Sequence, residues 1–303
     1  MIRVLVTDGM EKNAIKELKA KGFEVVEKFY EPEFLGEKLK NFDVIVIRSA
    51  TKVRKPIIDK ALEGGRLKLI IRGGVGVDNI DVAYARENGI NVANTPNASS
   101  ESVAELALAH MFAISRFVNI SNVSMRQGKW DKKKYVGVEI GGKTLGLVGF
   151  GRISKQLAKK ASALGMTVIY TDITGESSGF DGYKFLGLND LLKESDYVSL
   201  HIPFIKEQGA TIGKEQLDMM KDGSFLINCA RGGVVDEAAL LEALDNGKLA
   251  GAGVDVFVEE PIKNETLVNH PKVSVTPHIG AATEEAQTRI GTEIKSIICD
   301  FFK

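Results

Sequence analysis

The chain has 303 residues, and its 40 lysines and arginines balance 40 aspartates and glutamates, for a formal net charge of +0 at pH 7. This balance argues against a nucleic-acid-binding protein or one held on an anionic membrane surface. The length exceeds that of most single hydrophobic cores, so two domains are expected. The two cysteines, Cys229 and Cys299, stand in unrelated contexts and predict neither a disulfide framework nor a zinc site.

The sequence opens directly on a strand-like run at 2–6 without a signal-type apolar region. No apolar run approaches the ~20 residues that a transmembrane helix needs. We therefore expect a soluble, cytoplasmic protein.

Short β-branched runs alternate with helical patterns along the chain. The predicted strands are 4–7, 24–27, 44–47, 69–71, then 144–148, 166–170, 197–200, 224–227, 253–256 and 273–275. This βαβ rhythm predicts an α/β protein with two doubly wound parallel-sheet domains.

Two helical segments fall outside this alternation. Residues 102–120 are apolar on nearly every side, with a capping-box pattern of Ser102 and Glu105 at the start. Such a helix is buried, either between domains or, as we prefer, at a dimer interface that continues into the segment around Trp130. Residues 284–302 form an amphipathic pattern that could return to the first domain.

A glycine-rich turn, GFGRIS at 149–154, follows the predicted strand at 144–148 and precedes a helical pattern. A pyrophosphate needs a tight strand-to-helix turn, a backbone unobstructed by a Cβ, and free N–H groups at a helix N-terminus. Gly149 and Gly151 meet the first two needs. Ser154 replaces the third glycine of G-x-G-x-x-G and is small enough for close packing.

Asp172 stands two residues after the next predicted strand. An acid at this point of a dinucleotide-binding unit accepts hydrogen bonds from the adenosine ribose and repels the extra phosphate of NADP. Strand, turn, helix, strand and acid together predict an NAD site. That the glycines only shape a turn is the weaker interpretation.

Of the four histidines, His201 and His278 each follow a predicted strand, whereas His110 lies in the apolar helix and His270 in a polar loop. Ligands of open α/β sheets bind at the carboxyl ends of strands, which favours the first two. We interpret His278 as the acid/base, because Pro277 fixes its approach, and His201 as structural support.

Hydride transfer at a hydroxyl carbon requires a proton to move on or off its oxygen, and histidine titrates in the right range. Glu260 is the predicted carboxylate partner of His278, with Glu259 as the competing choice. Arg231, after another strand end, could hold a substrate carboxylate and carbonyl. An ordinary ion pair would explain any one of these residues, but three complementary groups at three strand ends favour a catalytic site.

Residues 228–236, 253–261 and 276–283, with the glycine turn, resemble the D-isomer-specific 2-hydroxyacid dehydrogenases, and the resemblance covers essentially the whole chain. It assigns substrate binding to Arg231, proton transfer to His278 and orientation of the histidine to Glu260.

The same resemblance implies a discontinuous, flavodoxin-like substrate domain (1–95 plus 283–303) and an inserted Rossmann NAD domain (96–282), with catalysis in the cleft between them. The NAD domain would include a dimerisation helix and arm at about 97–140. The implied cofactor-binding residues are Gly149, Gly151, Arg152, Ile153, Asp172, Pro203, Cys229, Ala230, Asp255 and Gly280.

Residues 48–53, 72–79 and 94–97 narrow the resemblance to family members that oxidise 3-phosphoglycerate. The glycines of the second stretch expose N–H groups for the substrate carboxylate, and the arginines would hold the phosphate. The implied substrate-binding residues are Arg48, Arg72, Gly74, Val75, Gly76, Asn97 and Lys132, the last from a neighbouring subunit. For Lys132 and the two lysines after it, a solvated charge run is the competing interpretation.

The implied activity is NAD-dependent oxidation of 3-phospho-D-glycerate to 3-phosphooxypyruvate, the entry step of L-serine biosynthesis, by a homodimer or higher homo-oligomer. No metal is implied. Many such enzymes continue into a regulatory domain; because the sequence ends at Lys303, we expect no serine feedback. Two alternatives stay open: a dehydrogenase of the same fold acting on glyoxylate, hydroxypyruvate or D-lactate, and an NAD-sensing corepressor or scaffold.

Overall fold

The structure is a computed structural model that describes residues 1–180 and 182–303. The chain divides into two compact units, Met1–Ser99 with Ala281–Lys303, and Ser100–Gly280. The sequence had placed the first boundary after residue 95, where the structure has 99, and the second after 282, where it has 280.

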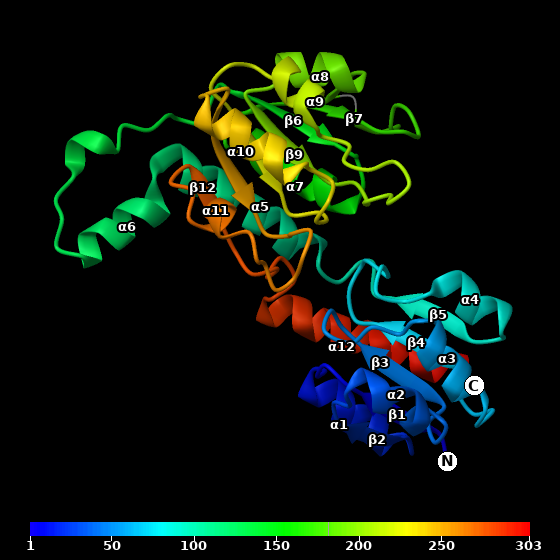
Figure 1. Cartoon of the computed structure of the whole chain (residues 1–303). Coiled ribbons are helices and arrows are strands. Elements are labelled where there is room, and N and C mark those ends of the chain that lie inside the picture. Colours follow the sequence, from blue (N-terminus) through cyan, green and yellow to red (C-terminus); the bar gives the residue numbers. More distant parts are fainter. Residues whose placement is uncertain (181) are drawn as a thin grey trace. The chain divides into compact units, whose positions relative to one another are not determined.

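Among the described residues, the first unit has one parallel five-stranded sheet in the order β2-β1-β3-β4-β5 (Figure 1). This is the order of flavodoxin-like folds. Its elements are β1 (Arg3–Val6), α1 (Lys12–Ala20), β2 (Glu24–Glu27), α2 (Pro32–Leu39), β3 (Val44–Ile47), α3 (Lys55–Leu62), β4 (Leu69–Arg72), α4 (Val82–Glu87), β5 (Asn91–Asn94) and α12 (Glu284–Phe301).

Helix α12 belongs to the first unit, as the amphipathic pattern at its end of the chain suggested. Its buried face, with Ile290, Ile294 and Ile298, joins Val4 and Val6 of β1 in one hydrophobic core. The last helix therefore completes a sheet that the first strand begins.

The second unit, within the part of the chain that the structure describes, has a parallel seven-stranded sheet in the order β12-β11-β10-β9-β6-β7-β8 (Figure 1). Counted from β6, this is the Rossmann order 3-2-1-4-5-6 with one more strand. The elements are α5 (Ser100–Arg116), α6 (Val118–Arg126), a 3-10 turn (Lys132–Lys134), β6 (Thr144–Val148), α7 (Arg152–Ala163), β7 (Thr167–Thr171), β8 (Lys184–Phe185), α8 (Leu188–Glu194), β9 (Tyr197–Leu200), α9 (Lys214–Met219), β10 (Ser224–Asn228), α10 (Glu237–Asp245), β11 (Leu249–Val254), α11 (Glu265–Val268) and β12 (Val273–Val275).

The prediction of one helix over 102–120 was wrong. Helix α5 begins at Ser100, before the predicted cap, and ends at Arg116; α6 starts afresh after Phe117, whose φ of 55° is left-handed, and the two helices are bent by 64°. The predicted burial of α5 is confirmed, since Ala104, Ala107 and Met111 are fully buried.

In the described ranges, no single helix is long and apolar enough to span a membrane, and only the bent pair α5 and α6 passes such a test by length and composition together. Strand β11 also differs from its prediction at 253–256: it begins four residues earlier and ends at Val254. The chain therefore leaves the sheet at Asp255, a point that matters for the site.

Candidate active site

The glycine turn lies between β6 and α7. Gly149 has a φ of +86°, and a Cβ there would stand 2.7 Å from the carbonyl oxygen of His201, so only glycine fits. Gly151 is the N-cap of α7; a Cβ there would meet nothing within 4 Å, and no described side chain caps the helix. The exposed helix end therefore leaves N–H groups and space for a pyrophosphate.

Ser154, which stands in place of the third glycine, is fully buried in the first turn of α7. Its hydroxyl donates to the carbonyl of Gly149. The serine thus closes the turn by a hydrogen bond where glycine would close it by close packing alone.

Asp172 follows β7 and faces the glycine turn. Its carboxylate accepts hydrogen bonds from the backbone N–H of Phe150 (2.7 Å) and from Thr174, through the backbone N–H (2.9 Å) and the hydroxyl (2.7 Å). Burial opposes ionisation, but these donors and the charge of Lys155 together lower the pKa of Asp172. A carboxylate is therefore held beside the turn, as a ribose acceptor requires.

The structure brings His278 and Glu260 together. The distance from His278 Nδ1 to Glu260 Oε2 is 2.7 Å, whereas the competing Glu259 pairs with Lys263 at 3.1 Å. Because a carboxylate only accepts, Nδ1 carries the proton, and Nε2 is left for a substrate oxygen. His278 itself adopts a left-handed backbone with φ 53°.

Glu260 remains ionised despite its partial burial. Burial acts to raise the pKa of Glu260, but the hydrogen bond and charge of His278, the backbone N–H of Phe257 and the positive charge of Arg231 lower it overall. Three predicted groups are thus electrostatically connected within the second unit.

The backbone before Arg231 is fixed by Asn228 at the end of β10. Asn228 Nδ2 donates to the carbonyl of Arg231 (3.0 Å), and Asn228 Oδ1 accepts from the backbone N–H of Ala230 (3.1 Å). A Cβ on Gly232 would stand 1.8 Å from the carbonyl oxygen of Phe257. The Arg231 loop and the loop that leads to Glu260 therefore pass in close backbone contact.

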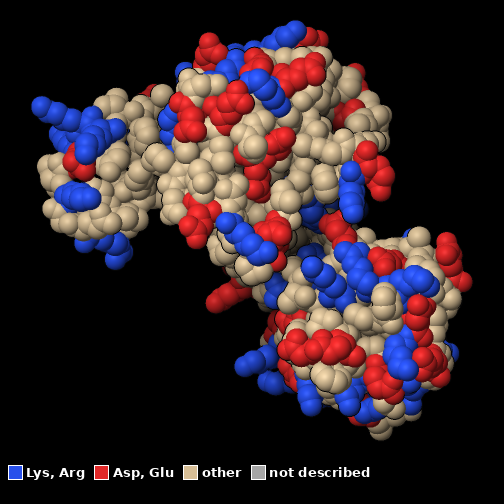
Figure 2. Space-filling model, viewed as in Figure 1, with Lys and Arg blue, Asp and Glu red and all other residues tan. Residues whose placement is uncertain are grey.

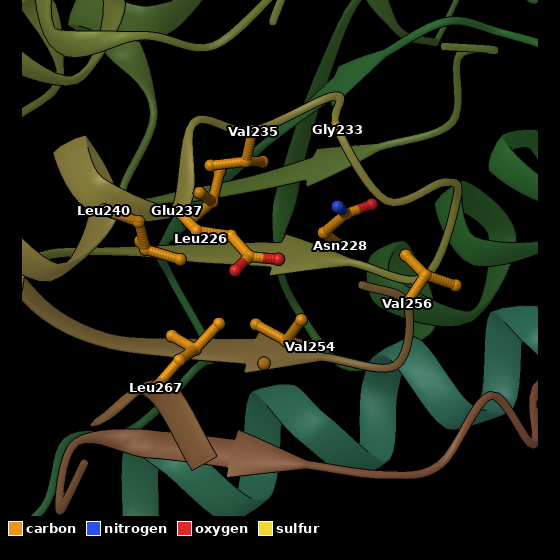
Figure 3. A pocket seen from close by; sticks show the side chains of 10 residues that line it. Leu226, Asn228, Gly233, Val235, Glu237, Leu240, Val254, Val256 and Leu267 are labelled. Atoms are coloured by element: carbon orange, nitrogen blue, oxygen red, sulfur yellow. The ribbon is translucent and has the colours of Figure 1, made fainter. Parts of the chain in front are cut away.

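A small pocket lies beside these loops, between β10, β11 and α10 (Figure 3). Its volume is about 10 Å³, room for about one water molecule, so it cannot hold a substrate. The carboxylate of Glu237, which lines it, accepts from the backbone N–H of Val258 (3.1 Å) and from Asn264 Nδ2 (2.9 Å). Glu237 thus supports the loop that carries Glu260.

Asp255, a predicted cofactor residue, is 1% exposed and accepts from the Thr276 hydroxyl (2.6 Å) and from the backbone N–H groups of Ile279 (2.8 Å) and Gly280 (2.9 Å). Its contacts within the chain are those of a loop anchor. A role toward nicotinamide stays a prediction for Asp255, as it does for Gly280.

Of the remaining predicted cofactor residues, Arg152 and Ile153 begin helix α7, and Pro203, Cys229 and Ala230 lie on loops after strands of the same unit. The thiol of Cys229 is buried, and burial, followed by the charge of Asp255, raises its pKa, which argues against a nucleophile. His201 bonds Ser199 Oγ through Nε2 (3.0 Å), and burial lowers its pKa to about 4, as suits a structural residue. Pro203 is exposed in the loop after β9.

Apart from Arg231 and Lys132, the predicted substrate-binding residues lie in the first unit. Arg72 Nη2 donates to Ser49 Oγ at 3.2 Å. A Cβ on Gly74 would stand 1.5 Å from Arg72 Nη1, so the guanidinium of Arg72 occupies the space that a side chain at position 74 would fill. Asp8 accepts from the backbone N–H of Arg48 (2.7 Å), which fixes the neighbouring arginine loop. Asn94 Nδ2 donates to the carbonyl of Val75 (2.5 Å), and Gly76 and Asn97 lie on the same loops.

Helix α6 and the segment after it, which we call the arm (117–138), extend from the second unit (Figure 1). Lys132 is exposed in the 3-10 turn of the arm, where Lys134 pairs with Asp131. Figure 2 shows basic side chains gathered on the arm with little acidic surface. Its exposed apolar residues are Val118, Ile120, Val123, Met125, Trp130, Val136 and Val138.

Sequence reasoning missed the groups that hold the predicted catalytic side chains and their loops. Asn228 bonds the backbone of Arg231, and Thr276 bonds the carboxylate of Asp255, whereas Glu237 bonds the backbone of Val258, two residues before Glu260. The only local signal was their position at or just after a strand end, which many structural polar residues share.

The Rossmann sheet order, the open helix N-terminus at Gly151 and the carboxylate of Asp172 define a dinucleotide-binding protein, and these residues fit NAD. Residues 108–280 match the family model "D-isomer specific 2-hydroxyacid dehydrogenase, NAD binding domain". The chain belongs to the D-isomer-specific 2-hydroxyacid dehydrogenase family.

Two curated relatives are each 45% identical to the chain. One is a D-3-phosphoglycerate dehydrogenase of Methanocaldococcus jannaschii; the match covers 98% of this chain and 58% of the relative, so the chain spans little more than half of that protein. The other is a hydroxypyruvate reductase of Thermotoga maritima, with 96% of this chain and 95% of the relative covered.

Solved structures share the fold over nearly the whole chain. A D-lactate dehydrogenase from Aquifex aeolicus, complexed with NAD and lactic acid, is 31% identical with a TM-score of 0.86, over 99% of this chain and 95% of that one. The family therefore contains enzymes named for several 2-hydroxy acids, and substrate choice must come from this chain's own residues.

Proposed function

We propose that the chain catalyses the NAD-dependent oxidation of a D-2-hydroxy acid, with 3-phospho-D-glycerate as the substrate and L-serine synthesis as the pathway. The observation that carries the reaction type is the 2.7 Å contact of His278 Nδ1 with the Glu260 carboxylate, at the carboxyl edge of the NAD domain. It leaves Nε2 of His278 to take the proton of the substrate hydroxyl.

NAD supplies the acceptor for the hydride that leaves the hydroxyl carbon. The chain's own residues manage the charges and the proton: Arg231 holds the substrate carboxylate and carbonyl oxygen, and His278 receives the hydroxyl proton as the carbonyl forms. Glu260 stabilises the resulting imidazolium, because its pKa is held low and it stays ionised.

The phosphate assignment rests on the arginine loops of the first unit. The guanidinium of Arg72 is set by Ser49 and by the space above Gly74, and the loop of Arg48 is tied to Asp8. Fixed arginines are the groups that bind phosphate by paired charged hydrogen bonds.

Arg48→Ala tests this assignment. Because the variant loses a charged contact only with a phosphorylated substrate, we expect the KM for 3-phospho-D-glycerate to rise about 10- to 100-fold, and the KM for an unphosphorylated 2-hydroxy acid to change little. Arg86→Ala, at an exposed arginine of the same unit, is the control. Equal effects of Arg48→Ala on both substrates would overturn the phosphate assignment.

A second candidate is the reduction of hydroxypyruvate. It is favoured by the Thermotoga maritima relative, which this chain covers almost end to end. The same Arg48→Ala comparison separates the two candidates, since hydroxypyruvate carries no phosphate.

We also propose a cytoplasmic homodimer joined through the arm, with Lys132 reaching the partner's substrate. Within the single chain, Trp130 is 78% exposed and Val136 80%, beside other exposed apolar residues of the arm. A second copy of the chain would cover this surface at a gain of about 25 cal/mol per Å² of apolar area.

A further inference from the structure

A chain of hydrogen bonds runs through the interior of the second unit and ends beneath the loop of His278. Its centre is His110 of α5, which is 2% exposed. His110 Nδ1 lies 2.9 Å from Ser274 Oγ, and Nε2 lies 3.0 Å from Thr276 Oγ1. Both ring nitrogens are thus hydrogen-bonded, one to Ser274 of β12 and the other to Thr276, the residue after that strand.

The burial of His110 favours its neutral form, because desolvation lowers its pKa more than the charge of Asp255 raises it. A neutral imidazole has one donor nitrogen and one acceptor nitrogen. The partners of the ring must therefore decide which nitrogen carries the hydrogen.

The direction of every bond follows from the carboxylate at one end. Asp255 Oδ1 accepts, so the Thr276 hydroxyl at 2.6 Å donates to it and must accept from His110 Nε2–H. Nδ1 of His110 then accepts from the Ser274 hydroxyl, whose oxygen accepts from Asn119 Nδ2 of α6 at 2.7 Å. Each group has a defined role, and His110 is the Nε2–H tautomer.

The other side of Asp255 holds the backbone of the active-site loop. It accepts from the N–H groups of Ile279 and Gly280, the two residues after His278. His278 has a left-handed φ of 53°, a conformation that is strained for a non-glycine residue and persists only where the surroundings enforce it. Asp255 ties down the two residues that follow His278 in the loop.

The ring of His110 also has little freedom to move. A Cβ on Gly253 of β11 would stand 2.5 Å from His110 Cβ, so α5 packs directly on the strand at this point. Close packing and two hydrogen bonds together fix the imidazole against the Thr276 hydroxyl.

We propose that His110 is a positioning residue for the reaction proposed above. As the Nε2–H tautomer it aligns the Thr276 hydroxyl on Asp255, and Asp255 in turn sets the backbone that presents His278 to the substrate. This inference rests on the proposed function for its kinetic test, but the tautomer and the loop contacts can be measured without turnover.

A purely structural histidine would affect stability and nothing else. A positioning residue should change kcat while the affinity for NADH, measured by fluorescence titration, and the KM stay near those of the wild type. We expect His110→Leu to lower kcat about 3- to 10-fold, the effect of one misaligned hydrogen bond. Backbone amide exchange at Ile279 and Gly280 should accelerate by a similar factor in the protein without ligands.

Two polar replacements form a matched pair. His110→Gln places an amide nitrogen near the position of Nε2 and should restore most of the kcat lost in His110→Leu. His110→Asn places its amide nitrogen near the position of Nδ1, which faces Ser274, and should not restore kcat. The pair remains informative if His110→Leu fails to fold.

The coupling is tested in a double-mutant cycle with Thr276→Val, which removes the hydroxyl through which His110 acts. Thr276→Val should lower kcat more than His110→Leu does. In the Thr276→Val background, His110→Leu should lower kcat no further. Histidine-selective ¹⁵N NMR should show His110 as the Nε2–H tautomer.

An Nδ1–H tautomer, additive effects in the cycle, or unchanged kcat and amide exchange in folded His110→Leu would each overturn the inference. If the wild type oxidises no 2-hydroxy acid at all, the proposed function fails instead. In that case the tautomer and the exchange of Ile279 and Gly280 still decide the role of His110.

Discussion

The active-site loops of the second unit and the arm of the same unit are built in opposite ways. Around His278, the polar groups described above are hydrogen-bonded within the chain. Glu260 bonds the imidazole ring of His278, and Asp255 accepts from two backbone N–H groups and from the Thr276 hydroxyl. The arm instead presents Trp130, Val136 and their apolar neighbours to solvent. The first region pairs its polar groups within one chain, and the second has the surface of an element that a partner completes.

The largest expected effect comes from removing the proposed acid/base, His278. His278→Asn should lower kcat for 2-hydroxy acid oxidation about 10²- to 10⁴-fold, because no other group would take the hydroxyl proton. Steady-state NADH formation is the measurement. His270→Asn is the matched control, since His270 lies in another loop and contacts the exposed Asp245. A His278→Asn enzyme within a few-fold of the wild type would remove this histidine from the mechanism.

A smaller effect concerns His201, which supports the glycine turn. Its pKa of about 4 lies below the ordinary 6.5, so between these values the unfolded chain binds a proton that the folded chain does not. Stability is therefore complete above pH 6.5 and decreases as the pH falls toward 4, by up to about 3 kcal/mol.

Urea unfolding of the wild type and of His201→Asn across this pH window isolates the contribution of His201 from those of the carboxylates. The variant should lose less free energy of unfolding than the wild type between pH 6.5 and 4. Parallel pH profiles would mean that His201 is protonated in the folded chain.

The smallest expected effect tests the arm. Met125→Glu adds a charge to a 52%-exposed apolar position and should weaken self-association at least about tenfold, as measured by sedimentation. Trp130 is the only tryptophan, so its emission reports directly on the arm and should shift to longer wavelength on dissociation. A wild type that is monomeric at all concentrations would show that the arm needs another partner.

The sequence predicted those parts of the site that depend on strand ends. His278, Glu260 and Arg231 were predicted because parallel strands bring their carboxyl ends to one edge, and the glycine turn was predicted because its geometry demands specific residues. The position of these ends is a property of the fold class and needs no tertiary detail.

Other features have no local signal. The left-handed Phe117 ends α5 within an apolar helical pattern that contains neither glycine nor proline, so one helix was predicted where two exist. His110 read as one more core residue, because its partners Ser274 and Thr276 lie 164 and 166 positions away. Pairing over such distances is set by the packing of α5 on the sheet.

Substrate choice is the central claim, and turnover measures it most directly. NADH formation from NAD and 3-phospho-D-glycerate, with a trap for the keto product, should be compared with D-glycerate, glycolate and D-lactate. We expect kcat/KM for 3-phospho-D-glycerate to be about 10²-fold higher than for the acids without phosphate. Turnover confined to the unphosphorylated acids would contradict the roles of Arg48 and Arg72 and assign the chain to another substrate of its family.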